Sequence, residues 1–138
     1  MTAVVLVDAG PLVALIDRTQ RHHAWVSETI KRFRNPLVSC DGAIAEATHL
    51  LGPGKAGCRA LMDMLERGTV TSVFELQPHV RRVSELMRRY QDVPMSFAAA
   101  CLVRMTELHA DVLVWTLDSD FRVYRRHGRQ AIPTLMPD

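Results

Sequence analysis

Short apolar runs alternate along the chain with longer segments in which apolar residues return every three or four positions. The short runs are predicted strands, because a strand buried on both faces of a sheet is apolar throughout. The longer segments are predicted helices with one apolar face. The predicted strands are 3–7, 37–39, 70–74, 112–116 and 132–135. The predicted helices are 12–16, 22–34, 42–51, 56–67, 78–90, 95–109 and 120–126.

The alternation of strands and helices is typical of βαβ units, which build a parallel sheet covered by helices. No internal repeat and no linker-like stretch interrupts the pattern. A length of 138 residues is also an ordinary size for one domain. We therefore expect residues 1–138 to form a single domain of the α/β class.

The composition excludes several classes of protein. With 48% hydrophobic and 23% charged residues, the chain is neither a disordered tail nor a low-complexity fibre. Its three cysteines are an odd number without close spacing, so no disulfide framework is predicted. No apolar run approaches the ~20 residues of a membrane span. Asp8 interrupts the first apolar stretch, and no basic residue precedes it, unlike a signal peptide. We expect a cytoplasmic protein without a membrane partner.

The type of basic residue is more informative than the net charge. Seventeen basic against fifteen acidic residues give a net charge of +2, too small to indicate a nucleic-acid partner by itself. Fifteen of the basic residues are arginine, whose guanidinium groups bind phosphate through two hydrogen bonds. Ordinary solvated surface is the competing interpretation of these arginines. The candidates for phosphate contacts are Arg81, Arg82, Arg122, Arg125 and Arg126.

Acidic residues follow predicted strands in three places. Asp8 comes directly after the first strand, and Asp118 and Asp120 follow the strand 112–116. Glu46 lies one turn inside the helix after the second strand. The carboxyl ends of parallel strands meet at one edge of a sheet, where ligands bind. Taken singly, each acid could be a helix cap or a turn residue. Their joint placement predicts a shared site at that edge.

Such a cluster of carboxylates favours a hard divalent cation. Neighbouring carboxylates repel one another, which raises their pKa values unless a cation neutralises them. A set of oxygen ligands without Cys or His suits Mg²⁺ or Mn²⁺. An ion held in this way can activate water for attack on a phosphodiester. The acids therefore predict metal-dependent chemistry on a phosphate-containing substrate.

Three segments carry a resemblance to a known family. They are VVLVDAGPLVALID (4–17), AIAEATHLL (43–51) and VWTLDSDFRVYRR (114–126). In order and spacing they resemble the three signature regions of PIN-domain proteins, above all the VapC-like ribonuclease toxins of type II toxin–antitoxin systems. The resemblance spans nearly the whole chain.

The resemblance implies a fold, an activity and partners. The fold would be three-layer α/β/α with a central, mainly parallel sheet of four to five strands. The activity would be that of an endoribonuclease dependent on Mg²⁺ or Mn²⁺, with RNA as substrate. A cognate antitoxin and a homodimer would be the protein partners. By the same resemblance, Asp8, Glu46 and Asp118 would bind the metal, Asp120 would join them as a catalytic acid, and Thr116 would support them.

The chain departs from the family at position 99. Many members have an aspartate there, where this chain has Ala99. With Ser96 as the N-cap, residue 99 is the third residue of a helix, a position that favours an acid. Either the chain is a natural degenerate member, or an aspartate was replaced to silence a toxic nuclease; the intact remaining acids favour replacement. The competing function is a catalytically inactive PIN-like module that binds RNA or a protein.

Overall fold

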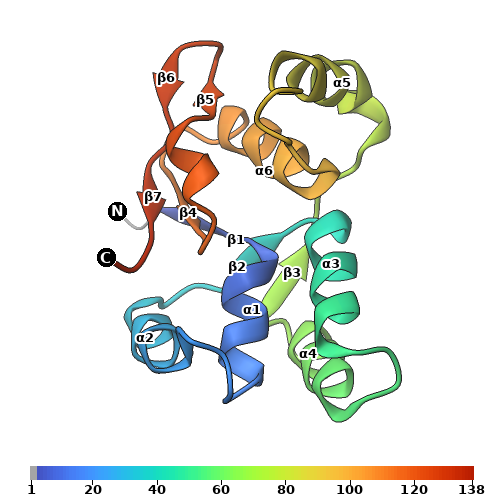
Figure 1. Cartoon of the computed structure of the whole chain (residues 1–138), viewed down its shortest axis with the longest axis vertical. Helices are drawn as coiled ribbons and strands as arrows, with labels where there is room; N and C mark the ends of the chain where they lie inside the picture. Colours follow the sequence, from blue (N-terminus) through green and yellow to red (C-terminus); the bar gives the residue numbers. More distant parts are fainter. Residues whose placement is uncertain (1–2) are drawn as a thin grey trace.

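The computed structural model describes residues 3–138, in which strands and helices alternate along the chain (Figure 1). The main sheet contains β1 (Val4–Val7), β2 (Leu37–Ser39), β3 (Val70–Ser72), β4 (Val112–Trp115) and β7 (Thr134–Leu135). The α-helices are α1 (Ala9–Ile16), α2 (His23–Thr29), α3 (Asp41–Leu51), α4 (Ala56–Glu66), α5 (Val80–Arg89) and α6 (Phe97–Glu107). The short 3₁₀ helices are η1 (Ile30–Arg32), η2 (Gln77–His79) and η3 (Ser119–Arg122).

The main sheet has the strand order β3-β2-β1-β4-β7, and every neighbouring pair is parallel. The first strand, β1, therefore lies in the middle, between β2 and β4. Its side chains alternate between two cores: Leu6 packs on one face, and Val5 and Val7 pack on the other. This alternation explains the continuous apolar run, because both faces of β1 are covered.

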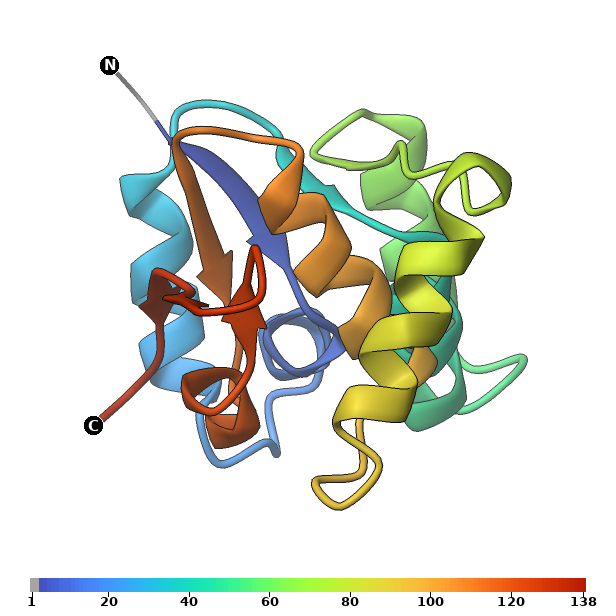
Figure 2. The same cartoon turned by 90° about the horizontal axis from the view of Figure 1, so that it is seen from above.

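Helices cover both faces of the sheet, which Figure 2 shows from above. Residues of α5 and α6 build the core on one face, and residues of α1, α2 and α4 build the core on the other. Helix α3 contributes to both cores, since Ala43 belongs to the first core and Ala47 to the second. The predicted three-layer α/β/α architecture with a parallel sheet of four to five strands is confirmed. No helix within residues 3–138 has the length and apolar character needed to cross a membrane.

The predicted helix 120–126 is wrong in its second half. The turn η3 ends at Arg122, and residues Arg125–Arg126 form the strand β5, which pairs antiparallel with β6 (Gln130–Ala131). Positive φ angles at His127 (51°) and Gly128 (83°) allow the chain to reverse between them. The predicted strand 132–135 is shortened to β7. Pro133, which has no backbone N–H to donate, lies between β6 and β7.

Candidate active site

Asp8 lies at the carboxyl end of β1, where it is the N-cap of α1. Only 8% of the residue is exposed, and both carboxylate oxygens accept hydrogen bonds. Oδ1 accepts from the backbone N–H of Ala9 at 2.8 Å, and Oδ2 accepts from the Thr116 hydroxyl at 2.8 Å. Thr116 is itself fully buried at the end of β4. The structure thus places Thr116 against Asp8, the contact that a supporting role requires.

The hydrogen bonds continue from Thr116 into the following turn. The Thr116 hydroxyl accepts from the backbone N–H of Asp118 at 3.0 Å. Oδ1 of Asp118 in turn accepts from the backbone N–H of Asp120 at 2.9 Å. Asp118 is exposed and Asp120 is half-buried. One path of hydrogen bonds therefore joins Asp8 to the predicted acids after β4, which is the strand next to β1.

Glu46 belongs to the same charged region. Partial burial raises its pKa most, and the negative charges of Asp8 and Asp118 raise it further. Burial also raises the pKa of Asp8; hydrogen bonds from Thr116 and Ala9 oppose this effect, and the charge of Asp118 adds to it. The charges of Asp8 and Asp118 thus influence Glu46, although Glu46 is exposed on α3.

A further polar side chain near these acids is Tyr124. It is 1% exposed, and its ring makes edge contacts with Tyr90 and Phe121, at centroid distances of 5.1 and 5.3 Å. Burial raises the pKa of Tyr124 to about 12, with contributions from the charges of Asp118, Asp120 and Asp8. Tyr124 was not among the site residues predicted from the sequence. It could have been considered because it follows Asp120 by four residues and lies among several arginines.

Position 99 lies in the first turn of α6. Ser96 caps this helix, its hydroxyl accepting from the backbone N–H of Ala99 at 3.0 Å, so the predicted cap is confirmed. The start of α6 packs against the start of α3: a side-chain carbon added at Gly42 would lie 3.3 Å from the Cα atom of Ala98. Residue 99 therefore lies beside the helix that carries Glu46. Ala99 is 4% exposed and offers a methyl group where an acid was expected.

The donor chemistry of this edge fits Mg²⁺ or Mn²⁺, because every candidate ligand is a carboxylate oxygen. Burial raises the pKa values of Asp8 and Glu46 most, and the charges of neighbouring acids raise them further; a bound cation would offset this cost of ionisation. However, within residues 3–138 no three His, Cys, Asp or Glu side chains are grouped closely enough to hold an ion. The acids are thus suitable in kind but short of a closed three-ligand site.

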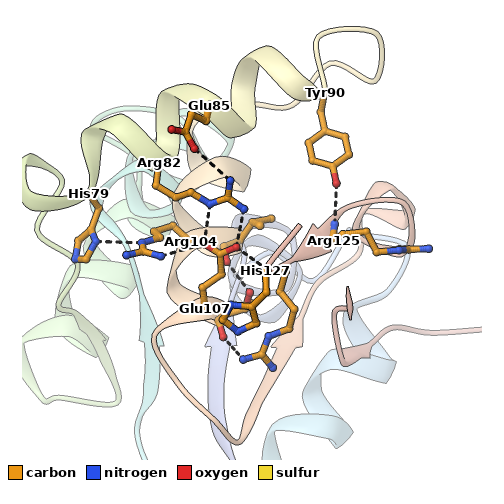
Figure 3. A network of polar contacts seen from close by, with 11 residues as sticks. His79, Arg82, Glu85, Tyr90, Arg104, Glu107, Arg125 and His127 are labelled. Carbon is orange, nitrogen blue, oxygen red and sulfur yellow. Dashed lines mark hydrogen bonds and ion pairs between the residues drawn. The ribbon is translucent and has the colours of Figure 1, made fainter. Parts of the chain in front are cut away.

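The candidate arginines separate into two groups. Arg81 on α5 and Arg122 on η3 are exposed. Arg82 instead binds the carboxylate of Glu107 through Nε at 2.9 Å and Nη2 at 2.7 Å (Figure 3). The Nη1 group of Arg125 donates to three backbone carbonyls of its own turn, at 2.8 to 3.2 Å. Arg82 and Arg125 are therefore engaged within the fold, whereas Arg81 and Arg122 face solvent.

The predicted phosphate contact of Arg126 is wrong. The residue is only 8% exposed, and its Nη2 group donates to the backbone carbonyls of Thr106 and His109. These carbonyls lie at the end of α6 and just after it. This buried guanidinium joins the β5–β6 hairpin to the end of α6 and cannot reach a phosphate in solvent.

Comparisons with known proteins agree with this architecture. The family model described as PIN domain matches residues 5–126. Among solved structures, the chain is similar to VapC20 of Mycobacterium tuberculosis, which is described as a sarcin–ricin loop cleaving toxin. The TM-score is 0.73 and the sequence identity 16%, over 86% of this chain and 93% of that one. No curated protein matches the sequence.

Proposed function

We propose, from the premise that this chain belongs to the PIN-domain family, that it is built as a metal-dependent endoribonuclease and acts as the toxin of a toxin–antitoxin pair. The observation that carries the proposal is the hydrogen-bonded path from Asp8 through Thr116 to Asp118, with Glu46 in the same charged region. The similarity to a sarcin–ricin loop cleaving toxin supports RNA as the substrate and a cognate antitoxin as a partner. A homodimer is proposed on the family resemblance alone.

In this proposal Asp8, Glu46 and Asp118 hold Mg²⁺ or Mn²⁺, partly through water, as Mg²⁺ commonly binds through one or two carboxylates. The bound ion supplies charge neutralisation and a more acidic water. Thr116 keeps Asp8 in one orientation by donating to Oδ2. Asp120, half-buried in the same turn as Asp118, is the proposed proton acceptor. The exposed Arg81 and Arg122 bind RNA phosphates.

Replacing Ala99 with aspartate tests the proposal. Ala99→Asp supplies the missing acid beside α3, and we expect RNA cleavage in Mn²⁺ to increase at least tenfold over the chain with Ala99. The measurement is cleavage of total RNA followed on a denaturing gel and by sequencing of the new ends. Ala99→Asn is the matched control, because it adds the same volume without the charge. A folded Ala99→Asp protein that leaves RNA intact in Mn²⁺ would contradict the proposal.

The second candidate function is a PIN-like module that binds RNA or protein without cutting. Ala99 favours it, as does the lack of a close group of three metal-binding side chains in residues 3–138. Chelation separates the two functions. A pure binding module retains RNA equally well in Mn²⁺ and in excess EDTA, whereas a nuclease site with partial ligands loses affinity when the cation is removed.

A further inference from the structure

Two cysteine side chains meet beside the candidate active site without belonging to it. Cys40 is the N-cap of α3, and Cys101 lies on α6; each is 1% exposed. Both side chains belong to the same buried core, and each thiol shifts the pKa of the other. Both line a cavity of about 240 Å³, whose apolar walls include Phe74 and Phe97. Helices α3 and α6, which carry the pair, lie next to each other in Figures 1 and 2.

The two thiols differ in character. Cys40 is the N-cap of α3, an 11-residue helix, and its thiol donates to the backbone carbonyl of Ala98 at 4.0 Å. The hydrogen bond from Cys101 lowers the pKa of Cys40, burial and the charge of Asp8 oppose this, and the helix N–H groups add to the lowering. The same contact and burial raise the pKa of Cys101. A thiol with thiolate character next to a protonated thiol is the arrangement of a reactive cysteine and its resolving partner.

We propose that Cys40 and Cys101 form an oxidation site, at which a small peroxide converts the pair into an intramolecular disulfide. The cavity beside them admits an oxidant of that size. The Cys40 sulfur attacks the peroxide O–O bond, becomes a sulfenic acid, and the first water leaves. The Cys101 sulfur then attacks the Cys40 sulfur, the S–O bond breaks, and the second water leaves. Two thiols and one hydrogen peroxide thus give one disulfide and two waters.

The position of the pair favours this product over other cysteine chemistry. Both side chains line one small cavity, and the helices that carry them pack against each other, so a bond within one chain is the product favoured by their position. A soft-metal site would need further ligands, and within residues 3–138 no third Cys, His, Asp or Glu completes such a group. The third cysteine, Cys58, is separate: its thiol donates to the backbone carbonyls of Thr48 and Gly52, both at 3.2 Å. Cys58 is therefore the internal control.

The disulfide would join two elements that carry the candidate site. Cys40 begins the helix on which Glu46 lies, and Cys101 is two residues beyond Ala99 on α6. Oxidation would therefore link the Glu46 helix to position 99. Formation of the bond itself depends on neither metal nor RNA, so it can be tested whether or not the proposed nuclease function is correct.

Peptide mapping after peroxide treatment is the test. The purified chain is exposed to hydrogen peroxide, alkylated and digested with trypsin without reduction. Cleavage after Lys55 and Arg89 places the three cysteines on separate peptides. We expect one linked pair, containing Cys40 and Cys101, with two hydrogens lost and Cys58 still alkylated. Thiol titration in denaturant falls from three to one and returns to three with dithiothreitol.

Alanine variants provide the controls. Cys40→Ala and Cys101→Ala each abolish the linked pair, whereas Cys58→Ala keeps it; circular dichroism checks that each variant folds. Because the unmodified chain and Cys58→Ala already report the bond, misfolding of the other two variants leaves the test decisive. The proposal is overturned if peroxide leaves both thiols open to alkylation, links only separate chains, or oxidises Cys58 alone.

Discussion

Glu107 shows how a single buried charge organises its surroundings. Its side chain is 2% exposed, yet it receives hydrogen bonds from Arg82, from Arg104 at 3.1 Å, and from the backbone N–H of His127 at 2.7 Å (Figure 3). Burial acts to raise the pKa of Glu107, but these donors, Arg82 first, outweigh it and lower the pKa to about 2. One carboxylate thereby connects α5, α6 and the β5–β6 hairpin.

Removing this charge should destabilise the protein strongly. Glu107→Gln leaves two guanidinium groups without their partner, and we expect the free energy of unfolding to fall by about 3 kcal/mol at pH 7. Because the folded pKa lies below the ordinary 4.5, this stabilisation is complete above 4.5 and is lost as the pH falls through 2. Urea titrations across this range measure it. Glu85→Gln, which removes an exposed partner of Arg82, should change stability by less than about 0.5 kcal/mol. Equal losses in the two variants would refute the prediction.

Asp8 has the opposite pH dependence. Its pKa is raised by burial, so the folded protein is least favoured when the carboxylate is ionised. Asp8→Asn should therefore increase the free energy of unfolding at pH 7, by on the order of 1 kcal/mol, because functional residues often reduce stability. The gain develops as the pH rises through the ordinary aspartate range and is absent well below 3.8. Thermal unfolding at acid and neutral pH checks this, with the exposed Asp63→Asn as control. A less stable Asp8→Asn at pH 7 would contradict it.

At the scale of elements, the β5–β6 hairpin is held through Arg126. Its guanidinium binds the carbonyls of Thr106 and His109, so the hairpin is fixed to the end of α6. Carbonyls at a helix C-terminus lack partners within the helix, and a buried cation satisfies them. The hairpin is thus part of the packed structure although each of its strands has only two residues.

Lysine cannot reproduce the two-carbonyl contact of Arg126, because its ammonium is a single point on a flexible stem. We expect Arg126→Lys to cost about 2 kcal/mol of stability, since it leaves a buried carbonyl without a donor. Hydrogen exchange should rise first at the amides of β5 and β6. The exposed Arg129→Lys in the same hairpin is the matched control. Unchanged exchange in Arg126→Lys would show that the anchor is dispensable.

Sequence patterns predicted the long elements well for a physical reason. The strands of the central sheet are apolar because both faces are buried, and that requirement can be read locally. The β5–β6 hairpin cannot be read in this way, because its short strands carry arginines and depend on the distant end of α6. The same holds for Arg126, which looks like a surface cation until its carbonyl partners are known. The link from Asp8 to Asp118 could be anticipated, because these acids follow β1 and β4, which are neighbouring parallel strands, whereas the position of Glu46 depends on how α3 packs.

At the scale of the whole molecule, a net charge of +2 gives no strong overall field, so the proposed RNA binding would depend on individual arginines. Arg81 is exposed, whereas its neighbour Arg82 is bound to Glu107. If RNA binds as proposed, Arg81→Gln should weaken binding across RNA sequences and reduce the slope of log affinity against log salt by about 1. Filter binding at several salt concentrations measures this. Arg59→Gln, an exposed arginine on α4, is the control and should leave the slope unchanged. Equal slopes for all three proteins would exclude Arg81 from the phosphate contacts.

The central place of β1 has a consequence for synthesis. Its neighbour β4 comes more than a hundred residues later, since Val4 pairs with Val112. A ribosome therefore releases Asp8 long before Thr116, the side chain that orients it. A polypeptide interrupted before Thr116 lacks the donor to Asp8 Oδ2, together with Asp118 and Asp120. Asp8 therefore gains its hydrogen bond from Thr116 only after β4 has been synthesised.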